Sequence, residues 1–341
     1  VVPSAEPRVN RPSKRRSGRS VPSDFRDMSL LCLAPNPSID RLLEVEVLTP
    51  GAIHRPVAVR AVAGGKGLNV ARTAAALGVS VRVAGILGGH AGRWIVDELQ
   101  RSRVEGSFAW MPAETRTCLS VLDQKSGLLT EFYEPGPPAA GEAWPEFVAL
   151  SETELLRRPM LVTISGSLPP KAPTDGIAKL CAVAHSAGVL TIVDTYGDAL
   201  REALLTTPWL VKVNVAEAVS LTGTRGADER AATVSARVLA AASGMGAIVT
   251  CGARGAVVVT RTGAWRMTPP SVGGPYTVGS GDAFLGGLAA GIVRGDSLED
   301  AIRLAGATGA ANSLSPGAGE LETACLPDLV RAVTLTPLET R

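Results

Sequence analysis

The chain has 341 residues, of which 45% are hydrophobic and 19% charged, a composition that allows one large α/β domain or two smaller ones. Its formal net charge of +2 at pH 7 argues against nucleic acid as a partner, because no excess of positive charge would attract a polyanion. The cysteines form no CxxC pair, so the sequence predicts neither a zinc site nor a disulfide framework. No uncharged apolar run reaches the roughly 18 residues of a membrane helix, so no membrane contact is predicted. These observations favour a cytoplasmic location.

Residues 1–27 differ in composition from the rest of the chain. The run SKRRSGRSVPS is basic and rich in serine, and it lacks the apolar residues that would offset the entropy cost of folding. It also lacks the apolar segment of a secretory signal. We expect a disordered basic leader over 1–27, with an organelle transit peptide as an alternative, and a folded domain over 28–341.

From Leu30 onward, short β-type runs alternate with helical ones. Strands are predicted at 30–34, 41–47, 56–62, 79–88, 161–169 (strand and loop), 189–194, 209–214, 247–252, 255–260 and 264–267, with a hairpin over 115–136. Helices are predicted at 68–78, 92–104, 174–188, 216–223, 280–295, 297–314 and 326–333.

This alternation predicts an α/β fold with a doubly wound, mainly parallel sheet flanked by helices on both faces. The segments at 41–62 and 115–133 have a period of two and do not fit such a sheet. We expect them to form a small β-rich lid at one edge.

The stretch TVGSGDAF (277–284) places small residues and one carboxylate at the start of an apolar helix. Free N–H groups at a helix N-terminus bind anions, and phosphoryl transfer needs such donors together with a base near the attacking hydroxyl. Asp282 and the amides of Gly279, Ser280 and Gly281 supply both. The alternative is that Asp282 only interacts with the positive end of the helix dipole.

The stretch AGGKGLNVAR (63–72) also leads into a helix. It matches neither the GxGxxG dinucleotide fingerprint nor the GxxxxGK[ST] phosphate loop. A plain strand-to-helix turn is one interpretation. The other is a substrate cradle in which backbone amides and Asn69 bind hydroxyls while Lys66 binds an anionic group.

Together these two stretches resemble the signatures of the ribokinase-like carbohydrate kinases. Blocks between and beside them follow in the family's order: PNPSID (35–40), TR (115–116), SGSLP (165–169), VDTYG (193–197), KVNVAE (212–217), TCGARGA (250–256) and AANS (310–313). The resemblance spans about 30–330 and is greatest to the branch of 1-phosphofructokinases and tagatose-6-phosphate kinases. It implies a kinase that uses ATP and Mg²⁺.

The resemblance also implies roles for single residues. Asp282 falls on the catalytic base, and the anion hole falls on the amides of Gly279, Ser280 and Gly281. Positions that contact the sugar hydroxyls are Asp40, Gly65 and Asn69, and those that hold the phosphate already on the sugar are Lys66, Arg116 and Ser167. The phosphate and Mg²⁺ region of ATP falls on Lys212, Asn214 and Glu217, with Glu217 reaching the metal through water. The nucleotide site is lined by Thr250, Gly252, Gly255 and Asn312.

Two positions depart from the family pattern. Val213 replaces a proline in the family's KPN, which affects the stiffness of that loop. Tyr133 stands in EFYEPGP where this branch often carries asparagine, and this difference bears on the choice of sugar.

Structural explanations compete with several of these roles. Asp40 is suited to capping a turn, Arg116 to a solvated strand edge and Glu217 to the first turn of a helix. Ser167 is suited to stabilising the turn before Pro169, and the residues at 250–255 to a hairpin alone.

The sequence therefore predicts a kinase that transfers the γ-phosphoryl group of ATP to a hydroxyl of a ketohexose phosphate. Fructose 1-phosphate, fructose 6-phosphate and tagatose 6-phosphate are the candidate acceptors. A kinase of an unphosphorylated sugar or a nucleoside, and a non-catalytic sugar or nucleotide sensor, are the alternatives. The exposed edges of a lid sheet also predict a homodimer.

Overall fold

A computed structural model describes residues 27–338 with the exception of residue 140. The predicted leader, 1–27, lies outside the described residues up to its last position, Asp27, where the first strand begins. In the described part of the chain, no helix combines the length and apolar character needed to cross a bilayer.

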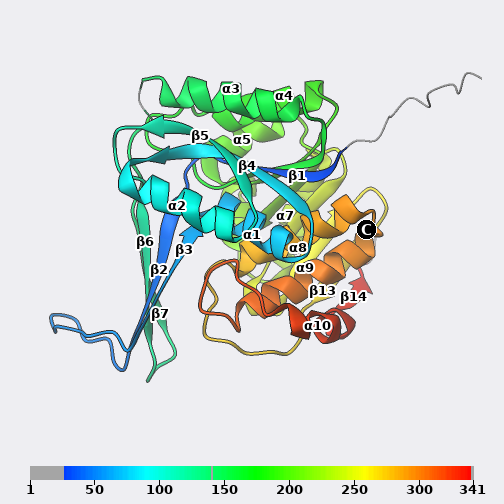
Figure 1. Cartoon of the computed structure of the whole chain (residues 1–341). Coiled ribbons are helices and arrows are strands. Elements are labelled where there is room, and N and C mark those ends of the chain that lie inside the picture. The colour runs from blue at the N-terminus through cyan, green and yellow to red at the C-terminus, as the bar shows by residue number, and fades with distance from the viewer. Residues whose placement is uncertain (1–26, 140, 339–341) are drawn as a thin grey trace, which may run out of the picture.

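The body of the molecule is built on a ten-stranded sheet with the order β14-β13-β12-β11-β10-β9-β8-β1-β4-β5 (Figure 1). The parallel strands are β1 (Asp27–Ala34), β4 (Ser80–Gly88), β5 (Glu105–Met111), β8 (Pro159–Ser165), β9 (Leu190–Asp194), β10 (Leu210–Asn214) and β11 (Gly246–Thr250). Antiparallel strands extend one edge: β12 (Ala256–Thr260), β13 (Ala264–Thr268) and β14 (Thr334–Pro337).

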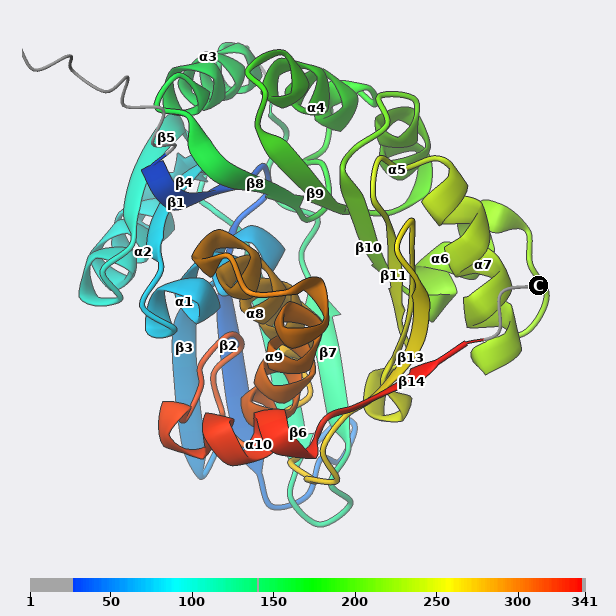
Figure 2. The same ribbon diagram turned by 90° about the vertical axis from the view of Figure 1, so that its right-hand side faces the viewer.

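Helices cover both faces of this sheet (Figure 2). One face carries α1 (Lys66–Ala76), α2 (Gly89–Arg101), α8 (Ser280–Arg294), α9 (Leu298–Asn312) and α10 (Leu326–Ala332). The other carries α3 (Ala143–Leu155), α4 (Gly176–Ser186), α5 (Gly197–Leu204), α6 (Val215–Thr222) and α7 (Glu229–Ala241).

The central strand β1 shows why both faces need cover. Leu30 and Cys32 pack into the cluster beneath α1 and α8, whereas Leu31 and Leu33 pack into the cluster beneath α3 and α4. Successive side chains of a strand point to opposite faces, so an uninterrupted apolar run buries itself only between two helical layers. The predicted doubly wound fold is confirmed.

The chain reverses direction across the sheet between β1 and β8. From β1 it proceeds through α1 to β4 on one side, whereas β8, β9 and β10 follow on the other side. The loops that leave the carboxyl ends of β1 and β8 therefore lead in opposite directions along the sheet. In open α/β sheets this is where ligands bind.

The predicted lid is also present, as a separate four-stranded sheet with the order β3-β2-β6-β7. Its strands are β2 (Ser38–Val45), β3 (Ala58–Gly64), β6 (Thr117–Asp123) and β7 (Leu129–Tyr133). β2 and β6 are parallel, and the other two pairs are antiparallel. The sheet projects from the body beside α1 and α2 (Figure 1).

The sequence patterns missed five elements, namely β5, α3, α5, α7 and β14. In α3, Pro145 lies in the first turn, where the N–H group it lacks would have no helical partner. In β5, the polar residues and Gly106 interrupt the apolar run, and Ala109 alone is buried. Short elements at the periphery take their stability from packing against the sheet, which a local pattern does not record.

Candidate active site

The N-terminus of α8 lies close to the sheet beneath the lid. Its N-cap, Gly279, has a φ of +80° and no side chain to cap the helix. A Cβ atom on Gly279 would lie 2.7 Å from Cβ of Ala318, so glycine is required both for the backbone conformation and for space. No side chain therefore caps the start of this helix, which is also how helix termini that bind anions are built.

One of the three predicted anion-hole amides already has a partner. The N–H of Ser280 donates to the carbonyl of Thr277 at 3.2 Å, so an anion would compete with this bond. The carbonyl of Gly279 accepts from Ala283, which continues the helix. A role of these amides in anion binding stays a prediction.

Asp282 lies in the first turn of α8 and is 8% exposed. Burial and the nearby charge of Asp194 raise its pKa to about 6, although Lys66, Lys212 and a hydrogen bond from Asn69 favour the ionised form. Nδ2 of Asn69 donates to Oδ2 of Asp282 at 2.9 Å. A carboxylate with this pKa can take up a proton near neutral pH, which is what a general base must do.

A second buried carboxylate, Asp194, lies between two lysines at the carboxyl end of β9. Oδ1 of Asp194 accepts from Nζ of Lys66 at 2.8 Å, and Oδ2 accepts from Nζ of Lys212 at 2.7 Å. Its side chain is fully buried, which raises its pKa, but the two lysines outweigh burial and lower it. Asp194 is therefore ionised and neutralises one of the two ammonium groups.

Lys66, predicted to bind the acceptor's phosphate, contacts a second carboxylate besides Asp194. Its Nζ also contacts Oε1 of Glu217 at 3.3 Å. Burial works to lower the pKa of Lys66, but the charges of Asp194, Glu217 and Asp282 raise it. The buried carboxylate of Asp194 needs a counter-charge in this position, which the ammonium of Lys66 supplies together with Lys212.

Lys212 lies directly beside the N-terminus of α8. A Cβ atom on Gly281 would be 3.1 Å from Nζ of Lys212, so this ammonium adjoins the helix start. Its positive charge adds to that of the helix dipole. The predicted place of Lys212 in a phosphate region is consistent with this location.

The three predicted sugar-hydroxyl residues lie together. Asp40 accepts from the N–H of Gly65 at 3.1 Å, from Nδ2 of Asn69 at 3.3 Å and from the hydroxyl of Ser38 at 2.6 Å. A Cβ atom on Gly64 would lie 2.1 Å from the carboxyl carbon of Asp40. The glycine-rich turn therefore makes room for this carboxylate, and Asn69 links it to Asp282.

Arg116 and Ser167 lie where the lid joins the body. The guanidinium of Arg116 donates to the carbonyls of Asn36, Pro37 and Glu134 at 2.8, 3.3 and 2.9 Å. Oγ of Ser167 accepts from Nδ2 of Asn36 at 3.0 Å. Arg116 has five N–H donors, of which two remain without a partner among the described residues, so it has capacity for a ligand as well.

Asn214 and Glu217 form a capping box at the start of α6. Oδ1 of Asn214 accepts from the N–H of Glu217 at 2.9 Å, and Oε2 of Glu217 accepts from the N–H of Asn214 at 2.9 Å. Glu217 thus lies in the first turn of a helix and also contacts Lys66, whereas its predicted role near the metal stays a prediction.

Mg²⁺ was predicted to reach Glu217 through water. Within 27–338, no cluster of three or more acidic, histidine or cysteine side chains has the geometry of a metal site. A Mg²⁺ ion that is held mainly by ATP phosphates and water needs only one or two protein carboxylates. Glu217 is the candidate carboxylate, since both carboxylate oxygens of the buried Asp194 are already bound by lysines.

The remaining predicted nucleotide residues shape loops. The hydroxyl of Thr250 donates to the carbonyl of Val213 at 3.3 Å, and Gly252 and Gly255 form the turn between the antiparallel strands β11 and β12. Nδ2 of Asn312 donates to the carbonyl of Val278 at 2.8 Å, and its Oδ1 accepts from the N–H of Gly319 at 2.7 Å. Asn312 thus fixes both loops beside Gly279.

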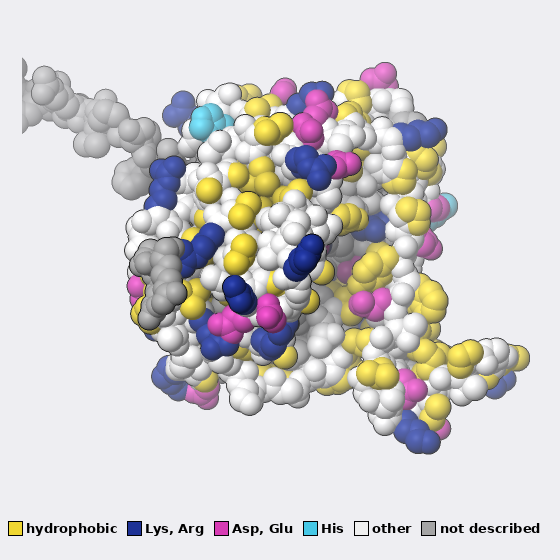
Figure 3. Space-filling model, turned by 180° about the vertical axis from the view of Figure 1, so that it is seen from behind, with side chains coloured by type: hydrophobic (Ala, Val, Ile, Leu, Met, Phe, Trp, Pro, Cys, Tyr) yellow, Lys and Arg dark blue, Asp and Glu magenta, His cyan; other side chains and the backbone are white. Residues whose placement is uncertain are grey.

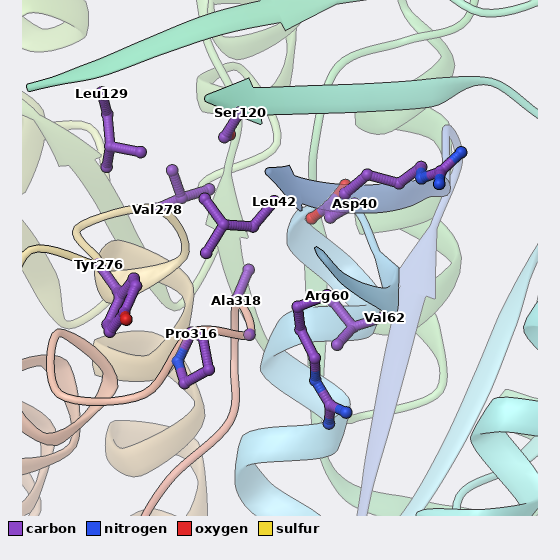
Figure 4. A pocket seen from close by; sticks show the side chains of 12 residues that line it. Asp40, Leu42, Arg60, Val62, Ser120, Leu129, Tyr276, Val278, Pro316 and Ala318 are labelled. Carbon is purple, nitrogen blue, oxygen red and sulfur yellow. The ribbon is translucent and has the colours of Figure 1, made fainter. Parts of the chain in front are cut away.

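A pocket lies between the lid and the body (Figure 4). The lid contributes side chains from one face of its sheet, here called the inner face: Asp40, Leu42, Arg60, Val62, Ser120 and Leu129. The body contributes the loops around Tyr276 and Ala318. Tyr276 donates to Glu44 at 3.0 Å, and Arg60 pairs with Glu320, so lid and body are in direct contact across the pocket.

Two polar residues at the centre of this arrangement were missed as site candidates. Asp194 ends a buried strand, and Asn36 follows another. A polar residue at the carboxyl end of a parallel strand was the available signal, because such ends meet at one edge of the sheet.

Comparison with known proteins agrees with this arrangement. The model of the pfkB family carbohydrate kinases matches residues 35–324. A tagatose-6-phosphate kinase from Staphylococcus epidermidis is 30% identical over 299 residues, which cover 86% of this chain and 95% of that protein. A 1-phosphofructokinase from Xanthomonas campestris is 36% identical over 277 residues, which cover 79% of this chain and 86% of that protein.

The fold is shared with solved structures. Phosphofructokinase-2 from Escherichia coli, in complex with potassium, is similar with a TM-score of 0.80 and 27% identity, covering 89% of this chain and 98% of that chain. The matched residues include both glycine-rich stretches at the crevice, since the family match extends from Pro35 past Asp282. The chain therefore belongs to the pfkB family of carbohydrate kinases, enzymes that transfer a phosphoryl group to a hydroxyl.

Proposed function

We propose that this kinase transfers the γ-phosphoryl group of ATP to a hydroxyl of a ketohexose phosphate, with Asp282 as the base. One observation carries the proposal: a buried carboxylate whose pKa is raised to about 6 lies in the first turn of a helix whose N-terminus is free of a side-chain cap. Phosphoryl transfer needs a base for the acceptor next to a site for negative charge, and this arrangement supports such a site at the start of α8.

The residues divide the work as follows. Oδ1 or Oδ2 of Asp282 takes the proton of the attacking hydroxyl, and Asn69 orients that carboxylate. Asp40 and the N–H of Gly65 hold other hydroxyls of the sugar. The amides at 279–281 and the ammonium of Lys212 stabilise the charge of the transferred group. When bound, ATP supplies the phosphoryl group and Mg²⁺ neutralises charge on its phosphates.

The relatives favour an acceptor that already carries a phosphate, since their names are 1-phosphofructokinase and tagatose-6-phosphate kinase. In this chain Arg116 offers two donors for that phosphate, with Ser167 nearby. Lys66 contributes by its charge, because its direct contacts are with Asp194 and Glu217. Fructose 1-phosphate, fructose 6-phosphate and tagatose 6-phosphate are the candidates.

The lid is proposed to exclude water, which would otherwise accept the phosphoryl group. Its second face, here called the outer face, exposes Val59 (55%) and Phe132 (57%). The segment 46–57, which projects from the lid between β2 and β3, also carries hydrophobic side chains (Figure 3). Among them is Ile53, which is 89% exposed. These surfaces support a homodimer formed through the lids. We further propose that the enzyme works in the cytoplasm.

The test is a coupled assay of ADP release with purified protein, ATP and Mg²⁺. The panel contains the three ketohexose phosphates, the free hexoses and a nucleoside. The proposal expects kcat/KM for one ketohexose phosphate to exceed that for every unphosphorylated acceptor by at least tenfold. A preference for a free sugar or nucleoside would replace the substrate, and binding of sugars without any ADP release would indicate a sensor.

A further inference from the structure

Arg72 ends the glycine-rich stretch AGGKGLNVAR and has no role in the mechanism proposed above. It follows Asn69 by three positions on α1, so the two side chains share one face of the helix. Arginine is rarely buried, yet Arg72 is 7% exposed. Burial lowers its pKa, although the charges of Glu320 and Asp40 act in the opposite direction. Its acceptors in the described part of the chain are carbonyl and amide oxygens and include no carboxylate, so this buried charge needs an explanation.

The guanidinium of Arg72 donates to acceptors in three different segments. Nη1 donates to the carbonyl of Ala63 at 2.6 Å, near the end of the lid strand β3, and to Oδ1 of Asn69 on α1 at 3.4 Å. Nη2 donates to the carbonyl of Ala318 at 2.8 Å. Ala318 in turn lies against Gly279, the N-cap of α8. One planar group thus connects the lid, α1 and the loop beside α8.

The bond from Arg72 to Asn69 bears on the proposed base. Asn69 is 2% exposed, and its Nδ2 donates to Asp282 at 2.9 Å. Its Oδ1 accepts from Arg72, the one partner of that oxygen among the described residues. An amide rotated by half a turn would direct Nδ2 at the guanidinium, which has donors and no acceptor. Arg72 therefore keeps the N–H groups of Asn69 directed toward Asp282.

This control of the amide matters most when Asp282 is protonated. An ionised Asp282 has acceptors alone, so it selects the N–H side of Asn69 without help. A protonated Asp282 carries an O–H donor, and an amide free to rotate would turn Oδ1 toward this proton. Such a bond would stabilise the protonated form and raise the pKa of Asp282 further. Because Arg72 holds Oδ1, the protonated form gains no such partner.

The charge of Arg72 itself does not act directly on Asp282. The charged groups that do so come from three elements: Lys66 on α1, Asp194 on β9 and Lys212 on β10. The carboxylate of Asp40 faces the same amide from the lid, with Oδ2 3.3 Å from Nδ2 of Asn69. A substitution at Arg72 leaves all of these groups in place, so its effect on Asp282 has to pass through Asn69.

We propose that Arg72 is a positioning residue, which locks the amide of Asn69 with its N–H groups toward Asp282 and so keeps Asp282 ready to take the proton of the acceptor. This inference rests on the proposed function, because it presupposes that Asp282 is the base. In this role Arg72 acts through Asn69 and touches neither the acceptor nor ATP.

The test compares the pH profiles of kcat/KM for a ketohexose phosphate. The variants at Arg72 are Arg72→Lys, which keeps the charge, and Arg72→Gln, which removes it; neither reproduces the guanidinium fork. Asn69→Ala and the double variant Arg72→Gln/Asn69→Ala complete a cycle. Arg303→Lys is the matched control, since Arg303 on α9 is also partly buried and donates to a carbonyl, that of Val333, at 2.7 Å. Thermal unfolding identifies the variants that fold.

In each folded variant at Arg72, the acidic limb of kcat/KM should move to higher pH by about 0.5–1 pH unit, the shift that one hydrogen bond produces. KM for ATP should change less than twofold, and Arg303→Lys should keep the wild-type profile. In the double variant, the limb should lie where Asn69→Ala alone places it, because no amide is left for Arg72 to orient.

Four outcomes would contradict the inference. An acidic limb at the wild-type pH in a folded Arg72 variant would overturn it and leave the kinase assignment intact. A further shift of the limb in the double variant, beyond that of Asn69→Ala, would also overturn it, since Arg72 would then act by another route. Failure of both Arg72 variants to fold would show that the guanidinium serves the fold alone. If Asp282→Asn retains normal turnover, the proposed base is wrong and the inference fails with it.

Discussion

The amide of Asn69 donates a hydrogen bond of 2.9 Å to the carboxylate of Asp282, joining residues that are 213 positions apart. It connects the two glycine-rich stretches, one at the start of α1 and the other at the start of α8. Because the same amide also contacts Asp40, the proposed base is fixed relative to the residues proposed to hold the sugar. Positioning of this kind is the main contribution a protein makes to phosphoryl transfer.

Replacement of Asp282 by asparagine should lower kcat by at least two to three orders of magnitude, because a general base contributes about 10²–10⁴-fold. The amide keeps the size of the side chain, so ATP affinity should change little. Asp300→Asn is the matched control, since Asp300 is also an acidic residue in the first turn of a helix. If both variants retain normal turnover, Asp282 serves only the helix dipole.

The rate should depend on the ionisation of Asp282. Burial and Asp194 raise its pKa to about 6, and a base acts only when deprotonated, so kcat/KM should fall as the pH drops below about 6. Asn69→Ala removes a donor to the ionised form and should move this acidic limb to higher pH. The phosphate of the acceptor titrates in the same way whether the wild type or Asn69→Ala is assayed. If the acidic fall of kcat/KM occurs at the same pH for both enzymes, the pH dependence comes from the substrate and not from Asp282.

Asp194→Asn should destabilise the fold by about 3–5 kcal/mol, because it leaves two ammonium groups without their shared buried counter-charge. The measurement is the free energy of unfolding in urea. Asp198→Asn serves for comparison, since Asp198 pairs with Arg201 while 70% of its side chain is exposed. That change should cost less than about 1 kcal/mol. Similar losses for both variants would contradict a structural role for Asp194.

Gly279→Ala should impair both stability and turnover, whereas Gly295→Ala should affect stability alone. Both glycines have a φ of +80°, so both substitutions introduce backbone strain of about 1–3 kcal/mol. Only at Gly279 does the new methyl group meet a neighbour, Ala318, while Gly295 has no atom within 4 Å. Denaturation curves and kcat for the two variants provide the comparison. Equal kcat values would argue against an anion site at the start of α8.

Sequence patterns correctly predicted the layered α/β fold, the separate lid and most of the central strands. They were sufficient because these features depend on local sequence patterns. β1 is apolar throughout since both of its faces are covered, whereas the lid segments intersperse polar with apolar residues. The position of Asp282 in the first turn of a helix could likewise be predicted, because the small residues that mark a helix start lie within one turn of it.

The tertiary structure decided which side chains meet. The role of Lys66 in holding a phosphate stays a prediction, whereas its contacts with Asp194 and Glu217, residues 128 and 151 positions away, came only from the structure. Asp194 itself was not singled out, because no property of VDTYG reveals that two lysines converge on it. A charged residue in a sequence does not reveal which residue will be its counter-charge. Burial makes a counter-charge necessary, and only the packing of β9, β10 and α1 determines which residues supply it.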